Sequence, residues 1–143
     1  MADHSIESNR AQVLGFLADW SAGRYEDAFA RAAETMEWHA MFHRQFTDKP
    51  PKGRQGFIDT FRRLGALFQD GMQMRPVSTT AEADRVSAEV ISSGRLAGSG
   101  EAYRNSYHFL FTLEGGLIVR VNAYLDTDHA YQVLARAPGV RDI

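Results

Sequence analysis

From Met74 onward the chain consists of four strand-like segments, and these constrain the fold more than any other feature. The segments are Met74–Thr80, Arg85–Leu96, Tyr103–Leu113 and Leu117–Asp126. Short turns separate them, at Ala81–Asp84, Gly98–Gly100 and Glu114–Gly116. Strands joined by short turns pair antiparallel. The second half of the chain therefore predicts an antiparallel meander.

The first half of the chain is predicted to be mainly helical. A helix from Ser5 to Ala22 has one apolar face, because Ile6, Val13, Phe16, Leu17 and Trp20 recur at spacings of three and four. A short second helix follows, with Tyr25, Ala28, Phe29 and Ala32 on one side. The alternation over Thr35–Phe42 predicts a strand, and a third amphipathic helix runs from Phe57 to Phe68. A last helical turn is expected over His129–Arg136. Helices followed by an antiparallel meander indicate one α+β domain spanning residues 1–143.

The side-chain pattern predicts which face of the sheet meets the helices. Odd positions of the third long segment are mostly large and apolar: Tyr103, Asn105, Tyr107, Phe109, Phe111 and Leu113. In the last segment the corresponding set is Leu117, Val119, Val121, Ala123 and Leu125. We expect both odd sets to face the helices. The opposite set contains Leu110, Ile118, Tyr124 and His108, residues suited to covering a partner subunit, so a homodimer through the outer face is expected.

Composition excludes several classes of function. The 143 residues contain no cysteine, which excludes disulfides, thiol catalysis and thiolate metal sites. The net charge is −2 and the arginines are spread along the chain, whereas a nucleic-acid-binding protein concentrates basic residues on one face. No window reaches the ~18 apolar residues of a membrane span, and the N-terminus lacks the regions of a signal peptide. We expect a cytoplasmic protein that binds neither nucleic acid nor membrane.

Three stretches carry a resemblance to a known family. They are Tyr103-Arg-Asn105-Ser-Tyr107-His-Phe109-Leu-Phe111, Glu114-Gly-Gly-Leu-Ile118 and Asn122-Ala-Tyr124-Leu-Asp126-Thr. With the order of elements before them, they make the chain similar to the SnoaL-like branch of the nuclear transport factor 2-like superfamily. The resemblance covers about Ser5 to Ala135. It implies a cone-shaped, curved antiparallel sheet wrapped around the N-terminal helices, a cystatin-like fold with an apolar pocket that is often dimeric through the sheet.

The resemblance does not carry a complete catalytic set onto this chain. Where ketosteroid isomerase has a tyrosine, a base aspartate and a protonated aspartate, this chain has Phe16, Trp38 and Tyr107. The arginine and paired aspartates of limonene epoxide hydrolase would fall near Val90, Ser92 and Ala123. Related cyclases also place an acid at the last of these positions. The resemblance therefore argues against isomerisation by the steroid-type dyad and against epoxide opening by the hydrolase residues.

Tyr107 and Asn105 are the candidate catalytic residues that remain. They lie two apart on one strand, so both are expected to point into the pocket, where they could hold a substrate carbonyl. The alternative is that both bond to neighbouring backbone or water, as buried polar groups usually do. His39 is a further candidate base, as is His43, if either turns inward; by alternation both face away from the pocket.

The pocket wall is predicted to be apolar and without a metal or cofactor. Its expected lining is Phe16, Trp20, Trp38, Phe42, Phe61, Val90, Phe109 and Ala123. The two tryptophans serve either the pocket wall or the core. Asp19, the carboxylate nearest the pocket, is expected on a solvated helix flank. The chain has no glycine-rich phosphate motif and no metal-ligand set, so no cofactor is implied.

Two functions remain open at this point. The first is binding of a small hydrophobic, cyclic or carbonyl-bearing metabolite, with isomerisation, cyclisation or dehydration by proton transfer as the possible chemistry. The second is a non-catalytic ligand-binding or protein-assembly module on the same scaffold. The absence of an acidic residue at Trp38 and at Ala123 favours the second function. The polar pair Asn105 and Tyr107 on the pocket face favours the first.

Overall fold

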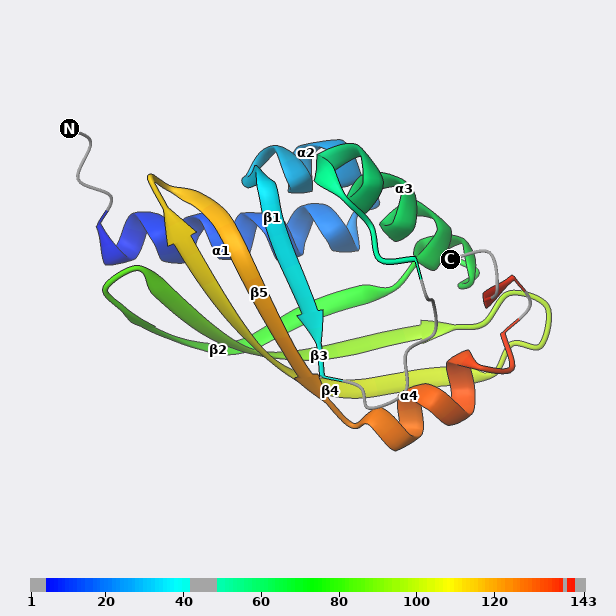
Figure 1. Ribbon diagram of the computed structural model, residues 1–143. Coiled ribbons are helices and arrows are strands. Elements are labelled where there is room, and N and C mark those ends of the chain that lie inside the picture. Colours follow the sequence, from blue (N-terminus) through cyan, green and yellow to red (C-terminus); the bar gives the residue numbers. More distant parts are fainter. Residues whose placement is uncertain (1–4, 42–48, 138, 141–143) are drawn as a thin grey trace.

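A computed structural model describes residues 5–41, 49–137 and 139–140, and these form one curved, unclosed sheet with helices on one face (Figure 1). The elements, in chain order, are α1 (Ile6–Ser21), α2 (Tyr25–Ala30), β1 (Ala32–Ala40), α3 (Gly53–Ala66), β2 (Gln73–Glu82), β3 (Arg85–Arg95), β4 (Ala102–Glu114), β5 (Leu117–Leu125) and α4 (Thr127–Leu134). The predicted α+β class is confirmed. Within the described residues, no helix is long and apolar enough to cross a membrane.

The strand order is β1-β5-β4-β3-β2, so β4 lies at the centre of the sheet. Strands β2 to β5 form the predicted antiparallel meander. The β4–β5 turn is made by Gly115 and Gly116, both at positive φ (57° and 80°), as a two-residue hairpin turn requires. Strand β1 pairs with β5 in parallel, with Trp38 opposite Val121 and Ala40 opposite Ala123. The sheet is therefore mixed at this edge.

Several details differ from the sequence predictions. Helix α3 spans Gly53–Ala66 rather than Phe57–Phe68, and β1 begins at Ala32 rather than at Thr35. Ala32 lies in β1 rather than in the second helix. In β5, Thr112 pairs with Arg120 and Leu113 with Ile118, which leaves Val119 as an extra residue in a bulge. The bulge reverses the alternation, so Ile118 is fully buried (0% exposed). The expectations that Leu117 and Val119 face the helices and that Ile118 lies on the outer face were therefore wrong.

The core lies between the inner face of the sheet and helices α1, α2 and α3. Helix α1 begins after Ser5, whose side chain accepts a hydrogen bond from the Ser8 amide (3.0 Å). It buries the predicted apolar stripe, which includes Val13, Phe16 and Leu17. From β4 the odd-numbered residues contribute Tyr103, Phe109, Phe111 and Leu113. The prediction that this odd set faces the helices is confirmed.

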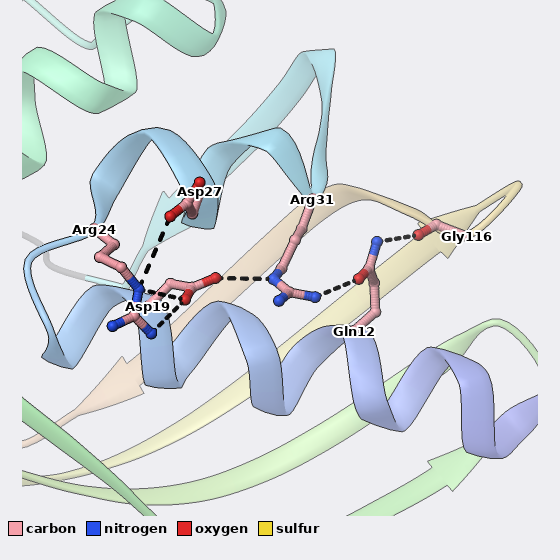
Figure 2. Close-up of polar contacts among 6 residues, drawn as sticks. All are labelled: Gln12, Asp19, Arg24, Asp27, Arg31 and Gly116. Carbon is pink, nitrogen blue, oxygen red and sulfur yellow. Dashed lines mark hydrogen bonds and ion pairs between the residues drawn. The ribbon is translucent and has the colours of Figure 1, made fainter.

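Asp19 lies at the centre of a charged network that ties α1 to the rest of the fold (Figure 2). One carboxylate oxygen accepts hydrogen bonds from Arg24 Nε (3.1 Å) and Nη2 (2.8 Å), and the other accepts from Arg31 Nε (3.1 Å). Arg31 Nη1 donates to Gln12 Oε1 (2.7 Å), and Gln12 Nε2 donates to the Gly116 carbonyl (2.9 Å). Asp19 is only 6% exposed, so the expectation of a solvated flank was wrong.

The electrostatics of this network favour the charged carboxylate. Burial by itself would raise the pKa of Asp19, but the hydrogen bonds and charges of Arg24 and Arg31 hold that pKa below its ordinary value. Gly15 makes room for the second arginine, because a Cβ at this position would lie 2.4 Å from Arg31 Cζ. The network therefore joins α1, the α2–β1 junction and the β4–β5 turn.

Replacing the carboxylate should destabilise the protein. We expect Asp19→Asn to lower the free energy of unfolding at neutral pH by about 1–3 kcal/mol, because two arginines lose charge-assisted hydrogen bonds. The loss falls short of that for a fully buried pair because both arginines are partly exposed. Urea denaturation of the two proteins measures it.

The pH dependence provides the control. Because folding lowers the pKa of Asp19, its contribution is complete above the unfolded pKa of about 3.9 and disappears as the pH falls through the folded pKa. The difference between wild type and Asp19→Asn should therefore shrink below about pH 4. Asp27→Asn, whose carboxylate is exposed and 3.9 Å from Arg24, should change stability by less than about 0.5 kcal/mol. Equal effects of the two variants would contradict a special role for Asp19.

Candidate functional site

The interior between the helices and the sheet is packed with aromatic rings. Trp20 lies 4.8 Å from Phe61, Trp38 lies 5.2 Å from Phe61 and 5.8 Å from Phe109, and Phe16 contacts Trp20, Phe29, Trp38 and Phe111 at 5.3–6.3 Å, all between ring centroids. Most of these pairs meet edge to face, the arrangement that aromatic quadrupoles favour. The structure thus brings the predicted lining rings together, and they fill the deep part of the interior with side chains.

The aromatic packing ends at a border of small and half-buried residues, which we call the inner border: Trp38, Ala40, Tyr107, Ala123 and Leu125. Ala123 pairs with Ala40 on one side and with Phe109 on the other, and Leu125 pairs with Tyr107. Trp38, Tyr107 and Leu125 pack against the core while remaining partly exposed. Ala40 and Ala123 are neighbours, and their short side chains leave a recess between the larger side chains. Val90, opposite Tyr107 on β3, is buried beneath this region. Phe42 and His43 lie outside the described residues.

A cluster of neutral polar groups lies beside the inner border, on the inner face of β3 and β4. The hydroxyl oxygens of Tyr103 and Tyr107 are 2.8 Å apart. Asn105 Nδ2 donates to the Tyr103 hydroxyl (2.9 Å) and to the Asp126 carbonyl (2.9 Å), and Asn105 Oδ1 accepts from the Asp126 amide (3.0 Å). Ser92 Oγ donates to the Asn105 carbonyl at 3.4 Å. We call Tyr103, Asn105, Tyr107 and Ser92 the tyrosine cluster.

The hydroxyl groups of the cluster are held in their neutral forms. Burial raises the pKa of Tyr107 well above its ordinary value; Tyr103 adds to the rise, and a hydrogen bond with Ser92 opposes it. Burial also raises the pKa of Tyr103, although hydrogen bonds with Tyr107, Asn105 and Ser92 lower it. Both tyrosines therefore remain protonated at neutral pH. They can donate a hydrogen bond to a ligand oxygen but cannot act as a base in that form.

Asn105 has a structural role in addition to its place in the cluster. Its amide pairs with both backbone groups of Asp126, which is the N-cap of α4 and accepts from the His129 amide (3.1 Å). Both donor hydrogens of the amide are used within the protein. The bonding to neighbouring backbone that the sequence left open as an alternative is thus what the structure shows for this residue.

His39 and His108 lie on the outer face of the sheet, away from the Tyr107 hydroxyl. His39 is opposite Asn122 on the outer face, 3.9 Å from Glu37, which also pairs with Arg120 at 3.6 Å. The structure therefore does not bring His39 to the interior, where a base would be needed. His108 also faces outward and shares a 2.7 Å hydrogen bond with Ser87. Within the described ranges, no three His, Asp or Glu side chains are grouped to hold a metal ion.

Sequence reasoning passed over two members of the site. Parity correctly placed Tyr103 on the same face of β4 as Tyr107, but no role in the site was predicted for it. His129 stacks on the Tyr103 ring, with centroids 5.4 Å apart and planes 5° from parallel. No sequence signal indicates that stack, because it depends on how α4 returns along β4.

The outer face of the sheet carries a hollow of about 470 Å³, and Val90, Tyr107 and Leu125 contribute to its lining. Its lining includes Val77, Glu89, Ile91, Ser106, His108 and Tyr124. Two of these apolar residues are well exposed, Val77 at 53% and Tyr124 at 46%. Apolar side chains on this face agree with the sequence prediction for Tyr124.

Comparison with solved structures identifies the fold. An NTF2-like protein from Burkholderia xenovorans matches with a TM-score of 0.73 at 20% identity, over 94% of this chain and 98% of that chain. TsrD from Streptomyces laurentii matches with a TM-score of 0.76 at 18% identity, over 91% and 96%. A protein from Catenulispora acidiphila with a ketosteroid isomerase-like fold, in complex with trimethylamine, matches with a TM-score of 0.72 at 16% identity, over 90% and 94%. At these identities the likeness establishes the fold alone.

Sequence comparison gives the family. A search of curated protein sequences finds no match. The family model of the SnoaL-like domain matches residues 13–121, which include the second half of α1, the aromatic interior, the tyrosine cluster and the first half of β5. The chain belongs to the SnoaL-like domain family.

Proposed function

We propose that the protein binds a small, largely apolar molecule carrying an oxygen acceptor, such as a cyclic ketone, at the inner border. The Tyr107 hydroxyl is the polar contact, and Trp38, Phe109, Ala123 and Leu125 supply the apolar surface. The observation that carries the proposal is the tyrosine cluster, a set of neutral polar groups beside an otherwise aromatic interior. Buried polar groups cost free energy unless they are bonded, and a core serving only stability has little use for them.

The chemistry of the border matches such a ligand. Aromatic rings and alanines provide apolar contact without charge, which favours an uncharged molecule. A protonated tyrosine in a water-poor site is a strong donor to a carbonyl oxygen. The SnoaL-like family includes isomerases, cyclases and ligand binders, and this site is suited to the binding that all three share.

Proton-transfer catalysis is the second candidate, in the form of isomerisation, cyclisation or dehydration. It is favoured by the donor at Tyr107, because polarising a carbonyl acidifies the neighbouring carbon. It also needs a base within hydrogen-bond reach. Of the described residues, Tyr103 is hydrogen-bonded to Tyr107, through a hydroxyl group; His39 faces outward and Asp19 is engaged by two arginines. We therefore place non-catalytic binding first.

Filling the inner border should weaken binding. We expect Ala40→Leu to weaken binding of ketones by roughly tenfold or more, about 1.4 kcal/mol, because the larger side chain takes the space beside Ala123. The probes are cyclohexanone, acetophenone and 2-acetylnaphthalene, followed by quenching of the fluorescence of Trp20 and Trp38.

The matched control is His39→Leu, one residue away on β1 and on the opposite face. It should bind the ketones as the wild type does. Binding that is unaffected by Ala40→Leu, or a wild-type protein that binds none of the three ketones, would overturn the proposed site.

We also propose that two copies of the chain associate through the outer face of the sheet. The exposed side chains of Tyr124 and Val77 and the hollow between them support this arrangement, because an isolated surface rarely keeps large apolar groups together. We expect Tyr124→Asp to halve the mass measured by light scattering at micromolar concentration. Ile6→Asp, at an exposed apolar residue of α1, is the control and should leave the mass unchanged. A monomeric wild type would rule out the association.

A further inference from the structure

We propose that Tyr103 is a positioning residue that makes Tyr107 a hydrogen-bond donor to the ligand, so that the site selects molecules with an oxygen acceptor. This inference rests on the proposed function, in which the ligand meets the Tyr107 hydroxyl. It assigns a role to a residue that the binding surface itself does not use. Hydrogen bonds connect Asn105 to Tyr103 and Tyr103 to Tyr107.

The first link has a fixed direction. Asn105 Oδ1 accepts from the Asp126 amide (3.0 Å), and Nδ2 donates to the Asp126 carbonyl (2.9 Å). Rotating the amide by half a turn would place two donors together at one contact and two acceptors at the other. The backbone of Asp126 therefore sets which end of the amide faces Tyr103. That end is Nδ2, so the Tyr103 oxygen receives a hydrogen bond (2.9 Å).

The second link can then run toward Tyr107. A tyrosine hydroxyl carries one hydrogen, and the 2.8 Å contact between the two oxygens needs only one. When the Tyr103 hydrogen occupies this contact, the Tyr107 hydrogen is released and can be donated to a ligand. Without a ligand, either tyrosine can supply the hydrogen of this contact. An acceptor in the site selects the first arrangement at no loss of hydrogen bonds.

Tyr103 itself is placed to support Tyr107 rather than to contact the ligand. Its side chain is 1% exposed, and its ring is held by His129 of α4 at 5.4 Å and by Phe68 at 5.9 Å between centroids. Tyr107, in contrast, is only partly buried at the inner border and stacks on Phe109 at 5.1 Å. Burial keeps both hydroxyls protonated by raising the pKa of each. The arrangement thus supplies a neutral donor with a fixed orientation.

Two probes of equal shape test the inference. Acetophenone carries a carbonyl oxygen where α-methylstyrene carries a methylene group. The measured quantity is the ratio of their dissociation constants, which cancels the effect of general packing. We expect Tyr103→Phe to reduce the preference for acetophenone by roughly fivefold, the effect of one neutral hydrogen bond. Tyr107→Phe should remove the preference at least as strongly, and Tyr124→Phe, on the outer face, should leave it unchanged.

The outcomes separate this inference from the proposed function. If Tyr107→Phe changes the ratio and Tyr103→Phe does not, the positioning role is wrong and the binding site stands. If neither probe binds the wild type, the proposed function fails for this class of ligand, and the inference fails with it. A general loss of packing would weaken both probes equally and would also contradict the role.

A measurement on the wild type decides the matter if Tyr103→Phe does not fold. Proton NMR of the acetophenone complex should show the Tyr103 hydroxyl hydrogen close to the ring hydrogens of Tyr107. The Tyr107 hydroxyl hydrogen should show a nuclear Overhauser effect to the methyl group of acetophenone. A Tyr107 hydrogen found between the two tyrosine oxygens instead would overturn the inference.

Discussion

The central position of β4 is the constraint on which the rest of the structure depends. This strand pairs with β3 from Ala102 to Thr112 and with β5 from Tyr107 to Glu114, so its register is fixed from both sides over the stretch that the two pairings share. Successive side chains of a strand point to opposite faces, and a paired strand cannot slip by one residue without exchanging the two faces. Tyr103, Asn105, Tyr107 and Phe109 are therefore forced onto the inner face together. The aromatic interior and the tyrosine cluster are two consequences of one ladder of backbone hydrogen bonds.

The tyrosine cluster keeps polar groups inside an aromatic interior without any charge. Asn105 satisfies the backbone at the start of α4, Tyr103 accepts from Asn105, and Tyr107 completes the series at the border. Each group bonds to the next, so the free-energy cost of burial is met within the cluster. Asp19, the one buried charged side chain among the residues that the structure describes, is instead paired with two arginines that flank α2. The charged network and the neutral site are thus separated.

Much of this arrangement could be predicted from particular residues. The parity of β4 placed Asn105 and Tyr107 on the inner face, and the helical spacing of α1 placed Phe16 and Trp20 against it. The bulge at Val119 could not be predicted, because one extra residue leaves no mark on composition yet reverses the alternation on one side of it. Asp19 was misplaced for a related reason: its burial depends on Arg31, which comes from another element. The role of Tyr103 also depends on contacts that join separate parts of the chain, from Asn105 to Asp126.

The parallel pairing of β1 with β5 has a consequence for how the chain is made. The first strand is synthesised early, but its partner is the last strand of the sheet. Until the ribosome has released β5, the backbone groups of β1 and the tryptophan on its inner side have no native neighbours there. Closing so long a stretch of chain is slow compared with forming a local hairpin. The nascent protein therefore carries an incomplete sheet for most of its synthesis, and an unpaired strand edge with exposed apolar surface favours aggregation.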